Sequence, residues 1–434
     1  MKAAAASIVV ALTLAAPAAA QPVTAIRAGR LLDVKTGAVI PKAVVLVSGG
    51  RITAVGSEVV VPADATLIDL SRYTVLPGLI DAHTHLLQNY SGTLGGDDPN
   101  MVLTVAQLGT VRRALLGAKM GREDLESGIT TVRDLGNSGV NGDVALRDAI
   151  NDGWVTGPRI VASTRALSAA GGQFGGLAAE AQALIANEYV VISNQDEARR
   201  AVRQAFYDGA DVIKVIVNTG PRVVSLDEMK AIVDEASRVG RKVAAHAIGD
   251  TATRIAAEAG VASIEHAYTV PDDVLAMMAK KRIFLVPTDY PAESYTAVGG
   301  SSGDTVEQQQ RRAAAAAQFA KNNAARLMRA VKAGVPIAFG SDAYYQFPGK
   351  TRGEASHQTL HAYHAAGMSP LQVIQAATIN AAEVLGWQSR IGTIEQGKLA
   401  DIIAVEGDPL VGVDALDQVR FVMKDGSVVR AAPR

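Results

Sequence analysis

Residues 76 to 85 read Leu76-Pro77-Gly78-Leu79-Ile80-Asp81-Ala82-His83-Thr84-His85. A Pro-Gly turn introduces a short apolar strand that ends in two histidines. Side chains at positions i and i+2 of a strand project from the same face, so both imidazoles should point the same way. Two neutral imidazoles suit a divalent metal such as Zn²⁺. A His-x-His pair is more often two surface histidines, but this chain has only seven histidines and the pair follows an apolar strand.

The composition is that of an ordinary globular protein. The chain has 434 residues, a length sufficient for one large domain and a smaller one. Hydrophobic residues make up 48% of it and charged residues 20%. The formal net charge of −1 provides no basic field for nucleic acid or anionic lipid. The absence of cysteine excludes thiol catalysis, disulfides and cysteine metal sites.

Residues 1 to 20 are predicted to be a secretory signal peptide. Lys2 precedes an apolar run from Ala3 to about Leu14, and three alanines stand before Gln21. The run is too short for a stable membrane span. We therefore expect cleavage after Ala20 and a periplasmic or secreted protein with no membrane association after cleavage. An uncleaved N-terminal anchor is the alternative.

Both ends of the mature chain are rich in short alternating strands. Residues 21–76 contain several such strands separated by turns at Gly49-Gly50 and Pro62-Ala63, and residues 390–434 show the same character. We expect these two segments to pair into one small β-sandwich domain around a long middle segment.

In residues 77–389 strands alternate with helices. After the strand ending at His85, strands are expected at 130–134, 159–163, 212–216, 243–247, 263–267, 283–287 and 336–340. Helices are expected at 196–208, at 225–239 with Ser225 and Glu228 as a capping box, and at 271–280. Eight strands in this order predict an α/β fold, a (β/α)₈ TIM barrel. The alternative, a doubly wound open sheet, lacks a dinucleotide-binding fingerprint.

Polar residues stand at the expected C-terminal ends of the barrel strands, where side chains of such barrels converge. Lys214 lies inside the apolar run 212–216, where a buried lysine would be costly without an anionic role or partner. The residues that should converge are His83, His85, Lys214, His246, His266 and Asp342.

With these residues, the chain resembles the metal-dependent amidohydrolase superfamily over essentially its whole mature length. It looks most like the imidazolonepropionase-like branch, which includes Xaa-Pro dipeptidases and ochratoxin amidohydrolases. The resemblance is carried by residues 77–85, the segments Gly128-Ile129-Thr130-Thr131-Val132-Arg133-Asp134 and Gly209-Ala210-Asp211-Val212-Ile213-Lys214, His246, Ile264-Glu265-His266, Gly340-Ser341-Asp342 and Gly397-Lys398-Leu399-Ala400-Asp401.

The resemblance implies two divalent metal ions. His83, His85 and Asp342 would hold one, His246 and His266 the other, and an N6-carboxylated Lys214 would bridge them. Zn²⁺ is expected, although such ligands also accept Mn²⁺ or Co²⁺. Asp342 would take a proton from water and later deliver it to the leaving amine. A homo-oligomer is also implied.

The implied reaction is hydrolysis of an amide bond in dipeptides or N-acyl amino acids, a carboxypeptidase-like or dipeptidase-like activity that could include ochratoxin A. One alternative is a cyclic amide, imide or lactone hydrolase of the same superfamily. Another is a non-catalytic periplasmic metal- or solute-binding protein. Chelator-sensitive release of free amino acid would separate the enzyme from the binding protein.

Substrate contacts are expected from the loops above the site. Related enzymes often carry a substrate-contacting histidine in a glycine-rich turn where this chain has Gln173. Residues 288–325 form a long segment with the position of a lid. His357, His361 and His364 share a helix face, and only the first is kept as a possible substrate contact. The other candidates are Tyr290, Tyr295, Tyr344 and Tyr345 for the pocket walls, and Arg222 and Arg352 for a substrate carboxylate.

Overall fold

The computed structural model describes residues 22–89, 100–298 and 303–432. The expected signal peptide, residues 1–20, and its cleavage site lie outside the described residues. Among the helices of the described segments, none combines the length and the apolar character that crossing a membrane requires.

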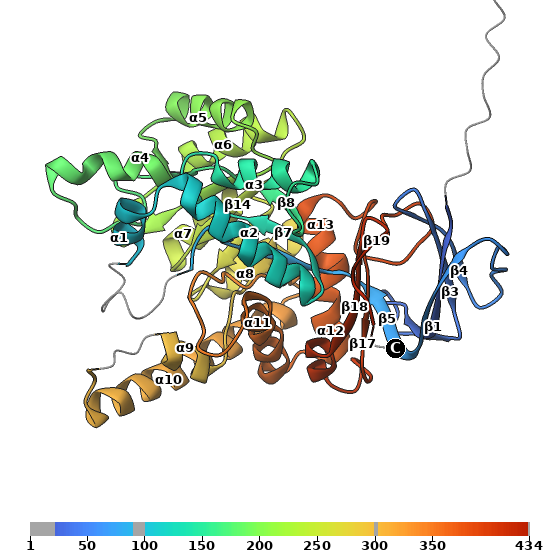
Figure 1. The fold of residues 1–434 in the computed structure, drawn as a ribbon. Helices are drawn as coiled ribbons and strands as arrows, with labels where there is room; N and C mark the ends of the chain where they lie inside the picture. Colours follow the sequence, from blue (N-terminus) through green and yellow to red (C-terminus); the bar gives the residue numbers. More distant parts are fainter. Residues whose placement is uncertain (1–21, 90–99, 299–302, 433–434) are drawn as a thin grey trace, which may run out of the picture.

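Strands from the two ends of the chain form one sheet (Figure 1). Its central pair is parallel, with Thr24 of β1 opposite Thr66 of β5, and the C-terminal strand β17 pairs antiparallel with β5. A separate apolar cluster that includes Ile26, Val45 and Phe421 forms the core of this region. Within the described residues the sheet has eight strands: β1 (Thr24–Leu32), β2 (Val39–Pro41), β3 (Val44–Ser48), β4 (Arg51–Gly56), β5 (Thr66–Pro77), β17 (Ile402–Val405), β18 (Val419–Lys424) and β19 (Ser427–Arg430). The boundaries of the small domain stay a prediction.

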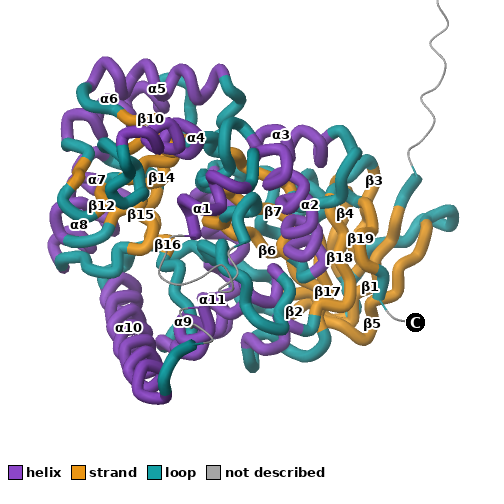
Figure 2. Tube along the Cα trace, turned by 60° about the vertical axis from the view of Figure 1, so that its left-hand side comes forward, coloured by secondary structure: helices purple, strands orange, loops and turns teal. Residues whose placement is uncertain are grey.

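The middle of the chain forms the barrel, and the expected fold class is confirmed. Its parallel strands lie inside a layer of helices (Figure 2). The amide of Asp211, just before β11, donates to Ala162 O of β8 (2.7 Å) and so connects the sheet of β6, β7 and β8 to the sheet that contains β11. The amide of Ala82 donates to Phe339 O (2.8 Å), where the last strand of the barrel meets the first. The regular barrel strands are β6 (Leu79–Thr84), β7 (Ile129–Asp134), β8 (Arg159–Ala162), β11 (Ile213–Ile216), β14 (Val243–Ala247), β15 (Ser263–His266) and β16 (Phe284–Val286).

The eighth barrel position, residues 336–340, is less regular than expected. Only one bridge, between Leu285 and Ile337, links it to β16 as a strand. A Cβ atom on Gly340 would lie 2.7 Å from the Cβ of His83 and 2.3 Å from a methyl of Val286. Only glycine therefore lets this segment approach β6 closely enough to bring the next residues, Ser341 and Asp342, over the barrel mouth.

The helices agree closely with the predicted segments. Ser225 and Glu228 form the expected capping box at the start of α6, and Gly367 ends α11. The segment after β16 contains two helices, of which α10 extends beyond the rest of the barrel (Figure 1). The helices are α1 (Asn100–Gln107), α2 (Thr110–Glu126), α3 (Gly142–Asn151), α4 (Ile185–Glu188), α5 (Gln195–Tyr207), α6 (Leu226–Ser237), α7 (Asp250–Ala259), α8 (Asp272–Lys281), α9 (Ala292–Val298), α10 (Val306–Lys332), α11 (Arg352–Ala366), α12 (Pro370–Gln375) and α13 (Ala381–Leu385).

The remaining short elements lie in the connections between these strands and helices. They are the strands β9 (Ala166–Ser168), β10 (Tyr189–Val191), β12 (Asn218–Thr219) and β13 (Arg222–Val223), and the short helical turns η2 (Ala179–Leu184), η3 (Ala376–Asn380) and η4 (Val413–Asp417).

Candidate active site

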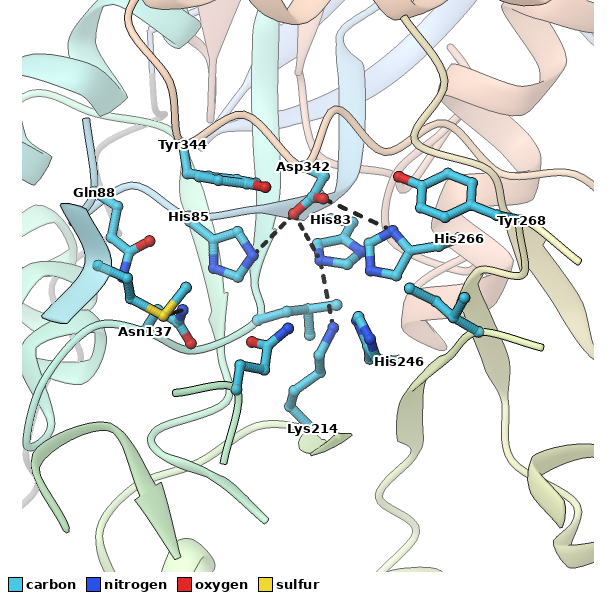
Figure 3. A pocket seen from close by; sticks show the side chains of 14 residues that line it. His83, His85, Gln88, Asn137, Lys214, His246, His266, Tyr268, Asp342 and Tyr344 are labelled. Atoms are coloured by element: carbon cyan, nitrogen blue, oxygen red, sulfur yellow. Dashed lines mark hydrogen bonds and ion pairs between the residues drawn. The ribbon is translucent and has the colours of Figure 1, made fainter. Parts of the chain in front are cut away.

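A cavity of about 150 Å³ lies at the C-terminal ends of the barrel strands (Figure 3). All six residues predicted to converge line it, although they come from five barrel strands spread over 260 residues of sequence. Its walls consist of His83, His85, Gln88, Met101, Leu135, Asn137, Gln173, Lys214, His246, Ile248, His266, Tyr268, Asp342 and Tyr344.

The two histidines at the end of β6, His83 within it and His85 directly after it, are each oriented by a group beside their Nδ1. The Nδ1 of His83 lies 2.8 Å from a carboxylate oxygen of Glu265, and the Nδ1 of His85 lies 2.8 Å from the carbonyl oxygen of Gly136. With Nδ1–H donating to these acceptors, each Nε2 keeps its lone pair. Both Nε2 atoms face Asp342, and such support by outer groups is typical of metal-binding histidines.

Asp342 lies between the histidines from different strands. One of its oxygens lies 3.4 Å from His83 Nε2 and 3.1 Å from His85 Nε2, and the other lies 3.7 Å from His266 Nδ1. Ligand atoms of His83, His266 and Asp342 all lie within 4.8 Å of one another, close enough to share one metal ion.

Burial favours the uncharged form of three imidazoles of this cluster, those of His83, His246 and His266. It lowers the pKa of His246 to about 3, with a further contribution from the positive charge of Lys214. It also holds the pKa values of His83 and His266 well below the ordinary value. Neutral imidazole is the form that binds metal, so these histidines are ready to act as ligands at neutral pH.

Lys214 is buried among these histidines, with 2% of its surface exposed. Its Nζ lies 3.4 Å from His83 Nε2, and within the described part of the chain no carboxylate forms an ion pair with it. Burial lowers the pKa of Lys214 to about 8, against the opposing charges of Glu265 and Asp342. With a pKa of about 8, about a tenth of the amine is uncharged at pH 7, far more than in an ordinary lysine.

A buried charge network beneath the cavity was not predicted from the sequence. Glu265 accepts from Arg133 Nη2 (3.0 Å) and from the hydroxyl of Ser263 as well as from His83. All of these side chains are almost fully buried. Charged residues in the middle of expected barrel strands, Arg133 in 129–134 and Glu265 in 263–266, were the sequence signal that could have revealed this network.

The backbone is strained at the ends of strands on this side of the barrel. His266, Thr288 and Asp342 have φ angles of 68°, 59° and 48°, in the left-handed region that residues with side chains seldom adopt. His266 Nδ1 also lies 2.8 Å from the hydroxyl of Thr288. Backbone strain of this kind is concentrated at functional sites, where the surrounding structure imposes it.

Several residues predicted as substrate contacts do lie at or beside the cavity. Gln173 and Tyr344 line it, and Tyr344 packs edge-on against His85 at 5.9 Å between ring centres. Tyr290, Tyr295 and Tyr345 line a smaller aromatic side pocket that shares Tyr268, Asp342 and Tyr344 with the main cavity.

Three other candidates occupy different places. Arg222 donates to the carbonyls of Ala170 (2.6 Å) and Phe174 (2.8 Å), so it supports the glycine-rich turn around Gln173. Arg352 is buried and donates to Gln88 O (3.1 Å) and to Thr84 Oγ1 (2.9 Å). His357 lies 3.2 Å from Asp417 in a different pocket. Their hydrogen bonds run to protein groups, and for Arg352 one of these is the backbone carbonyl of the cavity residue Gln88, so a contact with substrate stays a prediction for all three.

Comparison with known proteins agrees with this geometry. A family model described as "Amidohydrolase family" matches residues 74–431. Ochratoxinase of Aspergillus niger is 32% identical over 389 residues, which cover 82% of this chain and 75% of that protein. Imidazolonepropionase of Symbiobacterium thermophilum is 32% identical over 152 residues, covering 34% and 29% of the two chains.

A solved structure shows the same fold over nearly the whole chain. The crystal structure of a Xaa-Pro dipeptidase with methionine bound in its active site has a TM-score of 0.81 and 31% identity, covering 94% of this chain and 100% of that one. The chain therefore belongs to the amidohydrolase family, whose members are generally metal-dependent, and it is a hydrolase that acts on amide bonds.

Proposed function

We propose that this enzyme uses two divalent metal ions to hydrolyse the amide bond of dipeptides or N-acyl amino acids. The observation that carries the proposal is the position of Lys214, which is buried between histidines of different strands without a carboxylate partner among the described residues. A mononuclear site would leave this lysine without a function and at a cost in stability.

The donor set fits two metal ions. We assign His83, His85 and Asp342 to one ion and His246 and His266 to the other, all of them residues that line the cavity. Imidazole and carboxylate ligands suit Zn²⁺, which we propose as the metal. Two bound divalent ions would supply Lewis acidity toward water and toward the scissile carbonyl.

We propose that Lys214 is carboxylated. Its uncharged amine, favoured by a pKa of about 8, attacks carbon dioxide, so that an N–C bond forms and one proton is released. The resulting carbamate carries one negative charge and two oxygens. It converts a cation that would repel metal ions into an anion that can bind both.

Asp342 is placed to move the proton. Its carboxylate reaches into the cavity at 3.1 Å from His85 Nε2 and belongs to a segment held over the barrel mouth by Gly340. From there it can accept a proton from the attacking water and deliver it to the nitrogen of the leaving amine.

The substrate class is supported by the relatives and by the cavity. The similar solved structure is a Xaa-Pro dipeptidase with bound methionine, and the similar sequence is an ochratoxinase. A cavity of about 150 Å³ with an adjoining aromatic pocket suits a small amide with an apolar side chain.

A substrate panel measured with and without chelator tests the proposal. The panel contains dipeptides and N-acyl amino acids with varied C-terminal residues, ochratoxin A, a lactone and a cyclic imide. The matched control for each dipeptide is its C-terminal amide, which lacks the free carboxylate. We expect release of the C-terminal amino acid that stops with chelator and returns with Zn²⁺. Bound metal without chelator-sensitive turnover of any compound would contradict an enzymatic role on these substrates.

We further propose that the mature chain begins at Gln21 and is periplasmic or secreted. N-terminal sequencing of protein recovered from cell fractions tests this, and an intact Met1 in the cytoplasmic fraction would contradict it. Sedimentation of the same material tests the expected homo-oligomer.

A further inference from the structure

The side chain of Gln88 is an unsatisfied amide in the wall of the cavity. It is 1% exposed, and neither its Nε2 nor its Oε1 has a hydrogen-bond partner among the described residues. A buried polar group without a partner costs about 1–3 kcal/mol, and nearly all buried side-chain polar atoms are paired. An unpaired amide facing a cavity therefore indicates a ligand group that completes it.

The backbone of this residue is firmly held. Arg113 Nε donates to Leu87 O (3.3 Å), Arg352 Nη1 donates to Gln88 O (3.1 Å), and the amide of Gln88 donates to His85 O (3.2 Å). Two buried arginines thus fix the chain directly after the metal-site histidines. The backbone that carries the Gln88 side chain is therefore rigid, as a residue that recognises substrate requires.

The two sides of the cavity differ in chemistry. Gln88 and Asn137 lie on the side of His85 (Figure 3), and the lining residue Gln173 shares the hydroxyl of Tyr189 with Asn137; we name these three carboxamides the amide wall. The oxygens of Asn137 and Gln173 both lie near the hydroxyl of Tyr189, at 3.4 and 3.3 Å. A hydroxyl has a single hydrogen, so Tyr189 donates to only one of these two oxygens at a time, and among the described residues no donor is paired with the oxygen of Gln88.

The opposite side, beyond Asp342, is aromatic. Tyr268 lies on this side beside His266, whereas Tyr344 packs against His85; both also line the side pocket, where Tyr290 and Phe347 stack at 5.2 Å between ring centres. If Asp342 protonates the leaving amine, the leaving half of the substrate lies beside Asp342 and this aromatic pocket. The acyl half then lies against the amide wall.

We propose, resting on the function proposed above, that Gln88 determines specificity for the acyl half of the substrate. Its oxygen accepts from an N–H donor of that half, such as the α-amino group of a dipeptide. The preferred substrates are accordingly dipeptides, in which the acyl half carries an amino group, over N-acyl amino acids whose acyl half is purely hydrocarbon.

The test is a pair of substrates that differ in one group. Ala-Phe and propionyl-Phe share the scissile bond and leaving group, and only the first has an amino group. Gln88→Met removes both polar atoms of the amide and keeps a side chain of similar length. Gln88→Glu keeps an acceptor oxygen and adds a negative charge. Gln358→Leu, on α11 outside the cavity lining, is the control, and thermal unfolding verifies that each variant is folded.

We expect Gln88→Met to lower kcat/KM for Ala-Phe about tenfold more than for propionyl-Phe, because a site built to hydrogen-bond a group discriminates by that bond. Gln88→Glu should shift the ratio the other way, toward the ammonium-bearing Ala-Phe. Equal changes for both substrates in both variants would overturn the role of Gln88 alone. A wild-type enzyme that hydrolyses neither substrate would overturn the proposed function together with this inference.

Discussion

The molecule contains two groups of closely placed histidines with opposite properties. The barrel group, which includes His83 and His266, lines a buried cavity and comes from different strands. The second group lies on α11, where His361 Nε2 is 2.8 Å from a carboxylate oxygen of Asp417 and His364 Nδ1 is 2.9 Å from Met368 O. Histidines spaced along one helix face were thus used for local pairing, whereas the set that can bind metal was assembled from distant segments.

Electrostatics separates the two groups in the same way. Burial lowers the pKa values of His83, His246 and His266 and favours the neutral ligand form. Asp417 raises the pKa of His361 through a hydrogen bond and its charge and favours the imidazolium. Burial thus favours the neutral form of His83 even though the carboxylate of Glu265 lies beside its Nδ1, whereas the pairing with Asp417 favours the charged form of His361.

The largest loss of activity should come from replacing Asp342, the carboxylate that lies among the barrel histidines. Asp342→Asn removes a proton acceptor and an anionic ligand, so we expect kcat to fall at least about 10³-fold while the fold is retained. Initial rates and the thermal unfolding curve measure this. Near-normal kcat would remove Asp342 from the mechanism.

Lys214→Ala should lower kcat by about 10²-fold or more, because a bridging anion between the metal ions is worth several kcal/mol. Short carboxylic acids such as acetate or propionate should restore part of the activity by occupying the space of the carbamate. Activity of the alanine variant is measured against acid concentration. Full activity without added acid would exclude a bridging carbamate.

Glu265→Gln should weaken metal binding about 10- to 100-fold, because the group that orients His83 loses its charge. It also leaves Arg133 without its buried carboxylate, so the midpoint of thermal unfolding should fall. Competition with a chelating dye measures the affinity. Unchanged affinity with reduced stability would assign Glu265 to the fold only.

The smallest effect should come from the α11 group. His361→Gln should leave activity unchanged and lower stability by about 1 kcal/mol or less, because the pair with Asp417 is partly exposed. Because the pKa of His361 is raised in the folded protein, this residue contributes fully to the free energy of unfolding below pH 6.5, and the contribution is lost as the pH rises through the raised pKa. Because the pKa of Asp417 is lowered in the folded protein, this residue contributes to the free energy of unfolding above pH 3.8, and the contribution is lost as the pH falls through the lowered pKa.

Unfolding free energies of wild type and His361→Gln should therefore differ most between about pH 4 and 6.5 and converge once the pH exceeds the raised pKa of His361. His364→Gln is the matched control, because its imidazole faces a carbonyl rather than a carboxylate. A pH-independent difference would show that His361 acts through packing instead.

Much of the fold and the central cluster could be predicted from the sequence. Strand and helix periods are local, and residues such as Ser225 and Glu228 mark a helix start within four positions. The rule that strand ends of a barrel meet at one face was enough to bring Lys214 to His83. The eighth strand was less predictable, because its path depends on how closely Gly340 can approach β6.

The direction of long polar side chains could not be predicted. Arg222 and Arg352 were expected to face the substrate, yet they hold loop carbonyls. A guanidinium with five donors binds whichever acceptors the folded loops bring within reach. The pairing of Glu265 with Arg133 and the unpaired state of Gln88 have the same origin, since each depends on atoms far away in sequence.

The sequence by itself determined the barrel strands, the spacing of His83 and His85 and the identity of the six convergent residues, because periodicity and residue type act over short distances. The tertiary structure alone decided which polar atoms are satisfied by protein and which are left to face the cavity, because partners of buried groups are set only when strands and loops close around them. That is why the candidate metal cluster was predicted from the chain and the amide wall was not.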